Sequence, residues 1–136
     1  MKCIDTTYFV DLIRRPSTIR ELTKKLDNEG IHATTALNVY EALFGAYVLI
    51  DNMKREKIIH KLGSAFERLE VLSFKYSDAI LAAKIAGELA RNGKSVGADA
   101  VVAAIAINNG CKAVVTRNKK HFKWIEEITG LKVEAY

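Results

Sequence analysis

Apolar and polar residues alternate along the chain in a pattern that predicts short strands separated by helices. Five apolar runs have the length of strands, at residues 2–5, 31–34, 70–74, 112–116 and 131–135. Apolar residues recur at helical spacing between them, over residues 6–13, 16–30, 35–48, 52–69, 77–93 and 99–108. Apolar strands that alternate with helices are typical of a parallel sheet covered on both faces. We therefore expect an α/β fold with a central parallel sheet of four to five short strands.

Turn and capping residues mark several of the predicted helix boundaries. Pro16 lies where the first turn of a helix accepts proline, and Ser77 lies where a side chain can cap the next helix. Gly30 and Gly93 lie where helices end. The helix after Thr35 is predicted to bury one face, formed by Leu37, Tyr40, Leu43, Phe44, Tyr47 and Val48. The pattern assigns no helix between residues 117 and 130.

The composition and the lack of a linker segment predict a single domain over residues 1–136. The chain is 49% hydrophobic and contains no repeat or Gly/Ser-rich linker, and its length is typical of one domain. Cys3 and Cys111 lie far apart, which excludes a readable zinc cluster or disulfide framework and favours a reducing cytoplasm. Asp5 and Asp11 interrupt the region where a signal peptide needs an apolar core.

The most apolar stretch, residues 33–50, is almost long enough to span a bilayer but contains Asn38 and Glu41. A carboxylate in the middle of a membrane helix costs about 2.5 to 3.5 kcal/mol on insertion scales. We therefore expect no membrane segment.

The chain is basic, with 21 Lys and Arg residues against 16 Asp and Glu residues and a formal net charge of +5. An excess of positive charge favours a polyanionic partner such as RNA.

Three acidic residues stand among apolar neighbours instead of other charges. Asp5 ends the first predicted strand, Glu41 interrupts an apolar helix, and Asp99 begins the most apolar helix. Each also has a structural explanation: Asp5 can cap a helix, Asp99 can interact favourably with a helix dipole, and Glu41 can face solvent. If the three converge instead, their repulsion favours a bound divalent cation, and Mg²⁺ prefers such oxygen ligands.

The predicted parallel sheet indicates where these acidic side chains would meet. Ligands of open parallel sheets bind beyond the carboxyl ends of the strands. Asp5 ends the first strand and Asn118 follows the fourth. A metal held there can activate water and stabilise the charge that develops on a phosphate.

These residues together resemble the PIN-domain ribonucleases, and specifically the VapC-type toxins of bacterial and archaeal toxin–antitoxin pairs. The match extends over essentially the whole chain. Its motifs are the Asp-Thr element at residues 4–7, the Glu-bearing helix at 35–45, the third-acid motif at 97–100, and residues 114–118 with His121-Phe122. The resemblance implies a PIN-like three-layer α/β/α sandwich.

The resemblance also implies an endoribonuclease that depends on Mg²⁺, with Mn²⁺ as a possible substitute. Its catalytic residues would be Asp5, Glu41, Asp99 and Asn118, with Asp5 and Asp99 as the metal ligands. Asn118 replaces an acid of the family pattern and is expected to act as a neutral oxygen donor. Implied partners are an RNA substrate, a small antitoxin that inserts a segment into a groove, and a second copy in a homodimer.

Three further residues are expected to support this chemistry. Thr7 and Thr116 carry hydroxyls where the family orients carboxylates or phosphates. Arg117 is a candidate phosphate contact, although a solvated arginine fits the sequence equally well. His121 is interpreted as a packing or capping residue in preference to a general base.

Two other functions remain compatible with the sequence. One is an RNA-binding or RNA-processing module of the same fold with little catalysis, a possibility that Asn118 leaves open. The other is a phosphate-accepting domain, because an aspartate such as Asp5 at a strand end can accept phosphate. Residues 5–7 read Asp-Thr-Thr, without the second acid that such a domain would carry.

Overall fold

The computed structural model describes residues 1–136 and contains one sheet of five parallel strands. The strands are β1 (Cys3–Ile4), β2 (Ala33–Thr35), β3 (Glu70–Leu72), β4 (Ala113–Thr116) and β5 (Lys132–Ala135). Their order across the sheet is β3-β2-β1-β4-β5, and every neighbouring pair is parallel. The predicted α/β class and parallel sheet are confirmed.

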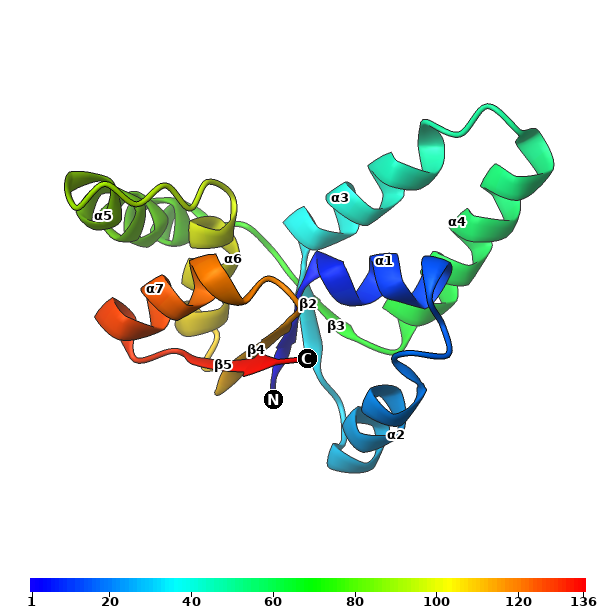
Figure 1. Cartoon of the computed structure of the whole chain (residues 1–136), viewed down its shortest axis with the longest axis horizontal. Coiled ribbons are helices and arrows are strands. Elements are labelled where there is room, and N and C mark those ends of the chain that lie inside the picture. Colours follow the sequence, from blue (N-terminus) through cyan, green and yellow to red (C-terminus); the bar gives the residue numbers. More distant parts are fainter.

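Helices cover both faces of this sheet (Figure 1). One layer contains α1 (Thr6–Arg14), α2 (Arg20–Glu29), α3 (Ala36–Tyr47) and α4 (Asn52–Glu67), and the other contains α5 (Tyr76–Arg91), α6 (Asp99–Asn108) and α7 (Lys119–Thr129). Each layer has its own apolar cluster against the sheet. The structure is therefore the predicted three-layer α/β/α sandwich.

The strand order reverses at β1, and this reversal creates the position of the site. Chain connections from β1 lead through α1 and α2 to β2, whereas the connection into β4 lies on the opposite face. Helices on opposite faces separate at such a point and leave a crevice at the carboxyl ends of the strands. Asp5 directly follows β1, and Arg117 and Asn118 directly follow β4.

Helix α6 supports the second layer, and its sequence explains why. Six of its ten residues are buried, among them Val102 and Ile105 at the centre of the larger apolar cluster. Burial of a valine or isoleucine side chain contributes about 1.5 to 3 kcal/mol. This packing holds Asp99, the first residue of the helix, in a fixed position at the crevice.

One helix was missed by the sequence pattern. Residues 119–129 form α7, in which Phe122 and Ile125 are buried. Three lysines and two glutamates surround these apolar residues in the sequence, so the pattern is weak. Gly130, with a φ of 79°, ends the helix in the left-handed conformation that favours glycine.

Two predicted helix starts were wrong. Pro16 lies in a turn over residues 16–19, and α2 begins only at Arg20. Ser77 does not cap α5, because the helix begins at Tyr76 and the N-cap position is Lys75. The Asp78 carboxylate accepts a hydrogen bond from the Lys75 backbone N–H at 2.8 Å and so satisfies that end of the helix.

The predicted buried face of α3 is wrong in part, because Leu37 and Leu43 are partly buried against the apolar clusters but the other four predicted residues are exposed. The buried residues of α3 are Asn38, Ala42 and Ala46, whereas Tyr40, Phe44, Tyr47 and the following Val48 are between 55% and 63% exposed. Ala42 and Ala46 belong to the same apolar cluster as Phe9 of α1. Small side chains allow the two helices to approach closely, and the aromatic side chains consequently point to solvent. None of the helices combines the length and apolarity that a membrane crossing requires.

Two alanine substitutions test these corrections. Phe122→Ala removes a fully buried ring and should lower the free energy of unfolding by about 3 to 5 kcal/mol. Phe44→Ala removes a ring that is 55% exposed and stacked on Tyr40, so its cost should stay below about 1.5 kcal/mol. Urea unfolding monitored by circular dichroism measures both values. Equal losses in the two variants would contradict the assigned burial.

Candidate active site

Asp5 is the most deeply buried of the predicted site carboxylates, with 4% of its surface exposed. It occupies the N-cap position of α1, but its side chain makes no capping hydrogen bond. Its Oδ2 accepts hydrogen bonds from the Thr116 hydroxyl at 2.8 Å and from the Thr7 hydroxyl at 3.4 Å. Burial raises the pKa of Asp5, and the hydrogen bond from Thr116 opposes this shift. The capping explanation therefore does not account for the position of this carboxylate.

Asp99 lies in the first turn of α6, close enough to Asp5 for the two charges to interact. Its Oδ2 accepts a hydrogen bond from Asn118 Nδ2 at 2.8 Å and lies 2.9 Å from His121 Nδ1. The pKa of Asp99 is raised to about 6, chiefly by burial and also by the negative charges of Asp5 and Glu41, while His121 opposes the shift. The structure thus brings the three acidic residues close enough for their charges to interact.

Glu41 lies at the exposed rim of this group. Its Oε1 accepts a hydrogen bond from the Thr6 hydroxyl at 2.8 Å. The Thr6 oxygen in turn accepts a hydrogen bond from Asn38 Nδ2 at 2.8 Å. Glu41 is therefore connected to the other side chains of the site, although it remains accessible to solvent.

Asn38 is a buried site residue that the sequence analysis did not assign. Its Oδ1 accepts hydrogen bonds from the Thr35 backbone N–H at 3.3 Å, in a capping box at the start of α3, and from the Thr35 hydroxyl at 2.7 Å. These contacts leave Nδ2 free to donate to Asp5 Oδ1 at 3.1 Å. The sequence signal for Asn38 was its position: an amide in an otherwise apolar helix, three residues before Glu41.

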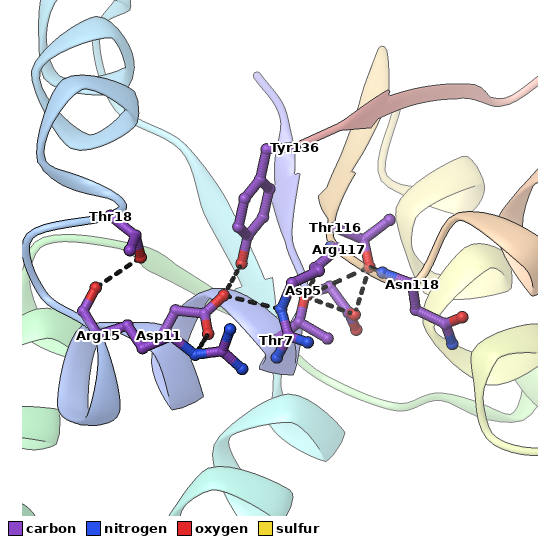
Figure 2. Close-up of polar contacts among 9 residues, drawn as sticks. All are labelled: Asp5, Thr7, Asp11, Arg15, Thr18, Thr116, Arg117, Asn118 and Tyr136. Carbon is purple, nitrogen blue, oxygen red and sulfur yellow. Dashed lines mark hydrogen bonds and ion pairs between the residues drawn. The ribbon is translucent and has the colours of Figure 1, made fainter.

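The hydroxyls of Thr7 and Thr116 connect Asp5 to the turn between β4 and α7 (Figure 2). Thr116 Oγ1 donates to Asp5 and accepts a hydrogen bond from the Asn118 backbone N–H at 2.9 Å. Thr7 Oγ1 accepts a hydrogen bond from the Arg117 backbone N–H at 3.0 Å. These contacts fix the backbone that carries Asn118 toward Asp99.

Arg117 itself is engaged with Asp11 of α1 (Figure 2). Its Nε donates to Asp11 Oδ2 at 3.0 Å, and the Tyr136 hydroxyl donates to the same oxygen at 3.0 Å. Asp11 is 2% exposed, and its Oδ1 accepts no hydrogen bond, with Arg15 Nε 3.7 Å away. The guanidinium therefore has a structural partner, and its contact with a phosphate remains a prediction.

Comparisons with known proteins agree with this geometry. A family model described as the PIN domain matches residues 2–127. The chain belongs to the PIN domain family. Its fold is shared with a chain of VapBC from Salmonella typhimurium, at 27% identity and a TM-score of 0.80 over 98% of this chain and 96% of that one.

Two further solved structures share the fold at lower identity. VapBC2 from Rickettsia felis has 24% identity and a TM-score of 0.83, over 99% of this chain and 98% of that one. VapBC-1 from nontypeable Haemophilus influenzae has 24% identity and a TM-score of 0.78, over 98% and 96%. A sequence search of curated proteins finds no match. The predicted resemblance to VapC-type PIN domains is confirmed.

The donor chemistry of this PIN domain fits a hard divalent cation. Asp5, Glu41 and Asp99 supply carboxylate oxygens, and no Lys or Arg forms an ion pair with any of them. Oδ1 of Asp99 and Oε2 of Glu41 accept no hydrogen bond. No group of three or more His, Cys, Asp or Glu side chains is already arranged around one point as a metal site. A cation held here would complete its coordination with water or substrate oxygens, as Mg²⁺ commonly does.

Asn118 and His121 both contact Asp99 from the start of α7. Asn118 donates a hydrogen bond to Asp99 through its amide nitrogen, and its role as an oxygen ligand stays a prediction. His121 does more than pack or cap, because its Nδ1 contacts Asp99 directly. The three-residue spacing between them places both side chains on one face of the helix start, which was the available signal.

The buried Asp11 contacts predict a loss of stability in Asp11→Asn. The substitution removes the charge that Arg117 and Tyr136 share and places an amide donor beside them, so the free energy of unfolding should fall by about 1 to 3 kcal/mol. Asp27→Asn is the matched control, since Asp27 is half exposed and pairs only with Arg68, and it should cost about 1 kcal/mol or less. Urea unfolding compares the two, and a smaller loss for Asp11→Asn would contradict the assigned network.

Proposed function

We propose that this PIN domain is the nuclease toxin of a toxin–antitoxin pair and that it hydrolyses RNA phosphodiester bonds with Mg²⁺ or Mn²⁺. The proposal rests on one observation: the three carboxylates near the ends of β1 and β4 have no Lys or Arg partner. Burial and two neighbouring negative charges raise the pKa of Asp99 to about 6, and no Lys or Arg pairs with Asp5, Glu41 or Asp99. Such an arrangement costs stability unless a cation binds there.

The side chains of the site have distinct tasks in this proposal. Asp5 and Asp99 hold the cation, which supplies a Lewis acid for the phosphate and a more acidic water. Glu41, exposed at the rim, orients the attacking water through its free Oε2. Asn38 and Thr116 keep both oxygens of Asp5 in a fixed orientation.

Asn118 and His121 hold Asp99 from the other side. Both contact Oδ2, so Oδ1 is left without a competing hydrogen bond. An ionised Asp99 can only accept hydrogen bonds, which assigns a proton to His121 Nδ1. Partners of a metal-binding carboxylate typically affect metal affinity or activity by about 10- to 100-fold.

A small antitoxin is the proposed inhibitory partner. The three solved relatives are structures of VapBC, and those from Salmonella typhimurium and Rickettsia felis are bound to DNA. In this chain an apolar groove of about 330 Å³ lies between α1, α3 and α4. Its lining includes Phe9, Ile13, Leu49 and Ile58, and Arg14 and Lys54 add positive charge. This groove suits an apolar segment with an acidic residue at its edge.

Homodimer formation and a cytoplasmic location belong to the same proposal. The exposed aromatic residues of α3, including the stacked pair Tyr40 and Phe44, give the chain an apolar surface that a second copy can cover.

An RNA-binding module without turnover is the second candidate function. It is favoured by the lack of three acidic or metal-ligating side chains already arranged around one point. Phosphate transfer to Asp5 has less support, because residues 5–7 read Asp-Thr-Thr, without the second acid that such a domain would carry.

Neutral substitutions of the two proposed metal ligands test the nuclease. Asp5→Asn and Asp99→Asn should each reduce metal-dependent cleavage at least about 100-fold, because each removes a ligand charge. The measurement is cleavage of fluorescently labelled RNA and of DNA strands of the same sequence, with Mg²⁺, with Mn²⁺ and with EDTA. Glu56→Gln is the matched control, since Glu56 is an exposed residue of α4.

Several outcomes separate the candidate functions. Retained activity in both aspartate variants would contradict the site. RNA affinity without turnover at saturating Mn²⁺ would support the binding module, and cleavage of DNA alone would contradict the proposed substrate.

The variant Asp99→Asn also tests how the charge of Asp99 affects the stability of the fold. A carboxylate whose pKa is raised by folding destabilises the folded state when it is ionised, above its folded pKa. Burial raises the pKa of Asp99 to about 6, so at pH 7.5 to 8 and in EDTA Asp99→Asn should melt at the same or a higher temperature than the unmodified chain. Scanning calorimetry at that pH and below pH 4 checks the sign, since the gain should shrink in acid. A lower melting temperature at pH 8 would show that Asp99 stabilises the fold.

A further inference from the structure

Helix α7 begins with two lysines at a position that disfavours positive charge. Lys119 and Lys120 occupy its first turn, which contains no acidic residue, and Asn118 makes no side-chain capping hydrogen bond. The N-terminal end of a helix dipole is positive, so cations there are unfavourable. The two lysines therefore interact unfavourably with the dipole of α7, close in sequence to Asn118 and His121 of the carboxylate site.

Lys120 converges with a second lysine on one tryptophan. The ammonium nitrogens of Lys94 and Lys120 lie 5.6 and 5.3 Å from the ring centroid of Trp124. Lys94 comes from the loop between α5 and α6, whereas Lys120 and Trp124 belong to α7. Two separate segments thus bring like charges to the same aromatic ring.

The position of Lys94 is fixed by the end of α5. Gly93, with a φ of 75°, adopts the left-handed conformation, and the Lys94 backbone N–H donates to the Leu89 carbonyl at 2.9 Å. The Gly93 N–H donates to the Ala90 carbonyl at 3.0 Å, which completes a Schellman motif. The backbone of Lys94 is therefore held by the helix end.

Neither of these lysines has a carboxylate partner. No ion pair involves Lys94 or Lys120, as holds for most lysines of the chain. A cation–π contact restrains an ammonium group without cancelling its charge. Both ammonium groups consequently remain available to an anion.

This pair of lysines is connected to the carboxylate site through one residue. The His121 ring stacks on Trp124, with centroids 5.7 Å apart and an angle of 27° between the rings. Nδ1 of the same histidine lies 2.9 Å from Asp99 Oδ2. The two lysines are therefore connected to Asp99 through Trp124 and His121.

We propose that Lys94, Lys120 and Trp124 form a phosphate-binding subsite for single-stranded RNA, next to the bond cleaved at Asp99. The inference rests on the proposed nuclease function for the identity of its ligand. The ammonium groups donate hydrogen bonds to backbone phosphates flanking the scissile one, and Trp124 holds them in place before RNA binds. Recognition of phosphates in this way is independent of base sequence.

Trp124 is the only tryptophan of the chain, so its fluorescence reports directly on this subsite. The full chain is titrated in EDTA with a single-stranded RNA of about 12 nucleotides, a length within typical single-strand site sizes. RNA binding should change the tryptophan emission. A poly-glutamate peptide is titrated in parallel, and an equal change with that peptide would reassign the surface to an acidic protein segment and overturn the proposal.

Charge-removing variants measure the contribution of the lysines. Anisotropy of labelled RNA is followed in EDTA at several NaCl concentrations for the double variant Lys94→Gln, Lys120→Gln. Its affinity should fall about tenfold, and the slope of log K against log salt should become shallower by about 0.7 for each phosphate that the variant no longer neutralises. The double variant Lys57→Gln, Lys61→Gln removes the same charge from α4, where neither lysine forms an ion pair, and should keep the wild-type slope.

Cleavage kinetics separate this subsite from the proposed function. With Mn²⁺, the Lys94/Lys120 double variant should show a KM raised about tenfold and a smaller change in kcat, as expected when binding shared by ground and transition states is removed. RNA binding by the wild type without cleavage would contradict the nuclease but support the subsite if the lysine variants still differ. Equal affinities and slopes in the two double variants would overturn the subsite, whether or not the wild type cleaves RNA.

Discussion

The buried carboxylate of Asp5 joins elements that are distant in the sequence. It receives hydrogen bonds from Asn38 of α3, from Thr116 of β4 and from Thr7 of α1. Each donor is held by a second contact: Asn38 by the Thr35 capping box, Thr116 by the Asn118 backbone, and Thr7 by the Arg117 backbone. A charged group at this depth is stable only when it is hydrogen-bonded. Burial of one aspartate therefore determines the arrangement of three surrounding segments.

Much of this arrangement could be predicted from the sequence, because strands, strand ends and isolated acids leave local signals. Asp5 and Asp99 stand at an apolar strand end and at an apolar helix start, and the fold brings their charges close enough to interact. The order of the strands, which places β4 beside β1, depends on long-range packing and was not predicted from the sequence. Asn38 and His121 escaped assignment because their partners lie 33 and 22 residues away.

Helix α3 shows why periodicity alone gave a face that is wrong in part. Its aromatic residues and its small residues both recur at helical spacing, so the sequence offers two apolar faces. Volume decides between them, because Ala42 and Ala46 allow α3 to approach α1 whereas aromatic rings would separate the helices. The missed helix α7 is the opposite case: two buried residues, Phe122 and Ile125, suffice when they enter a preformed cluster.

The two ends of the parallel strands differ in how their charged side chains are paired. At the amino ends, Lys2 is buried and forms ion pairs with Glu29 and Glu134 at 2.7 and 2.6 Å. Burial opposes its ionisation, but the hydrogen bonds that it donates to Glu134 and Glu29 raise the pKa of Lys2, so this end is neutralised within the chain.

At the carboxyl ends of the strands, the acidic and the basic side chains do not pair with each other. Asp5, Glu41 and Asp99 lack a Lys or Arg partner, while Lys94 and Lys120 lack a carboxylate partner and lie one aromatic stack away from Asp99. Direct pairing of these groups would have stabilised the free protein. Under the proposed function, a divalent cation on the acidic side and RNA on the basic side would balance these two groups of charge.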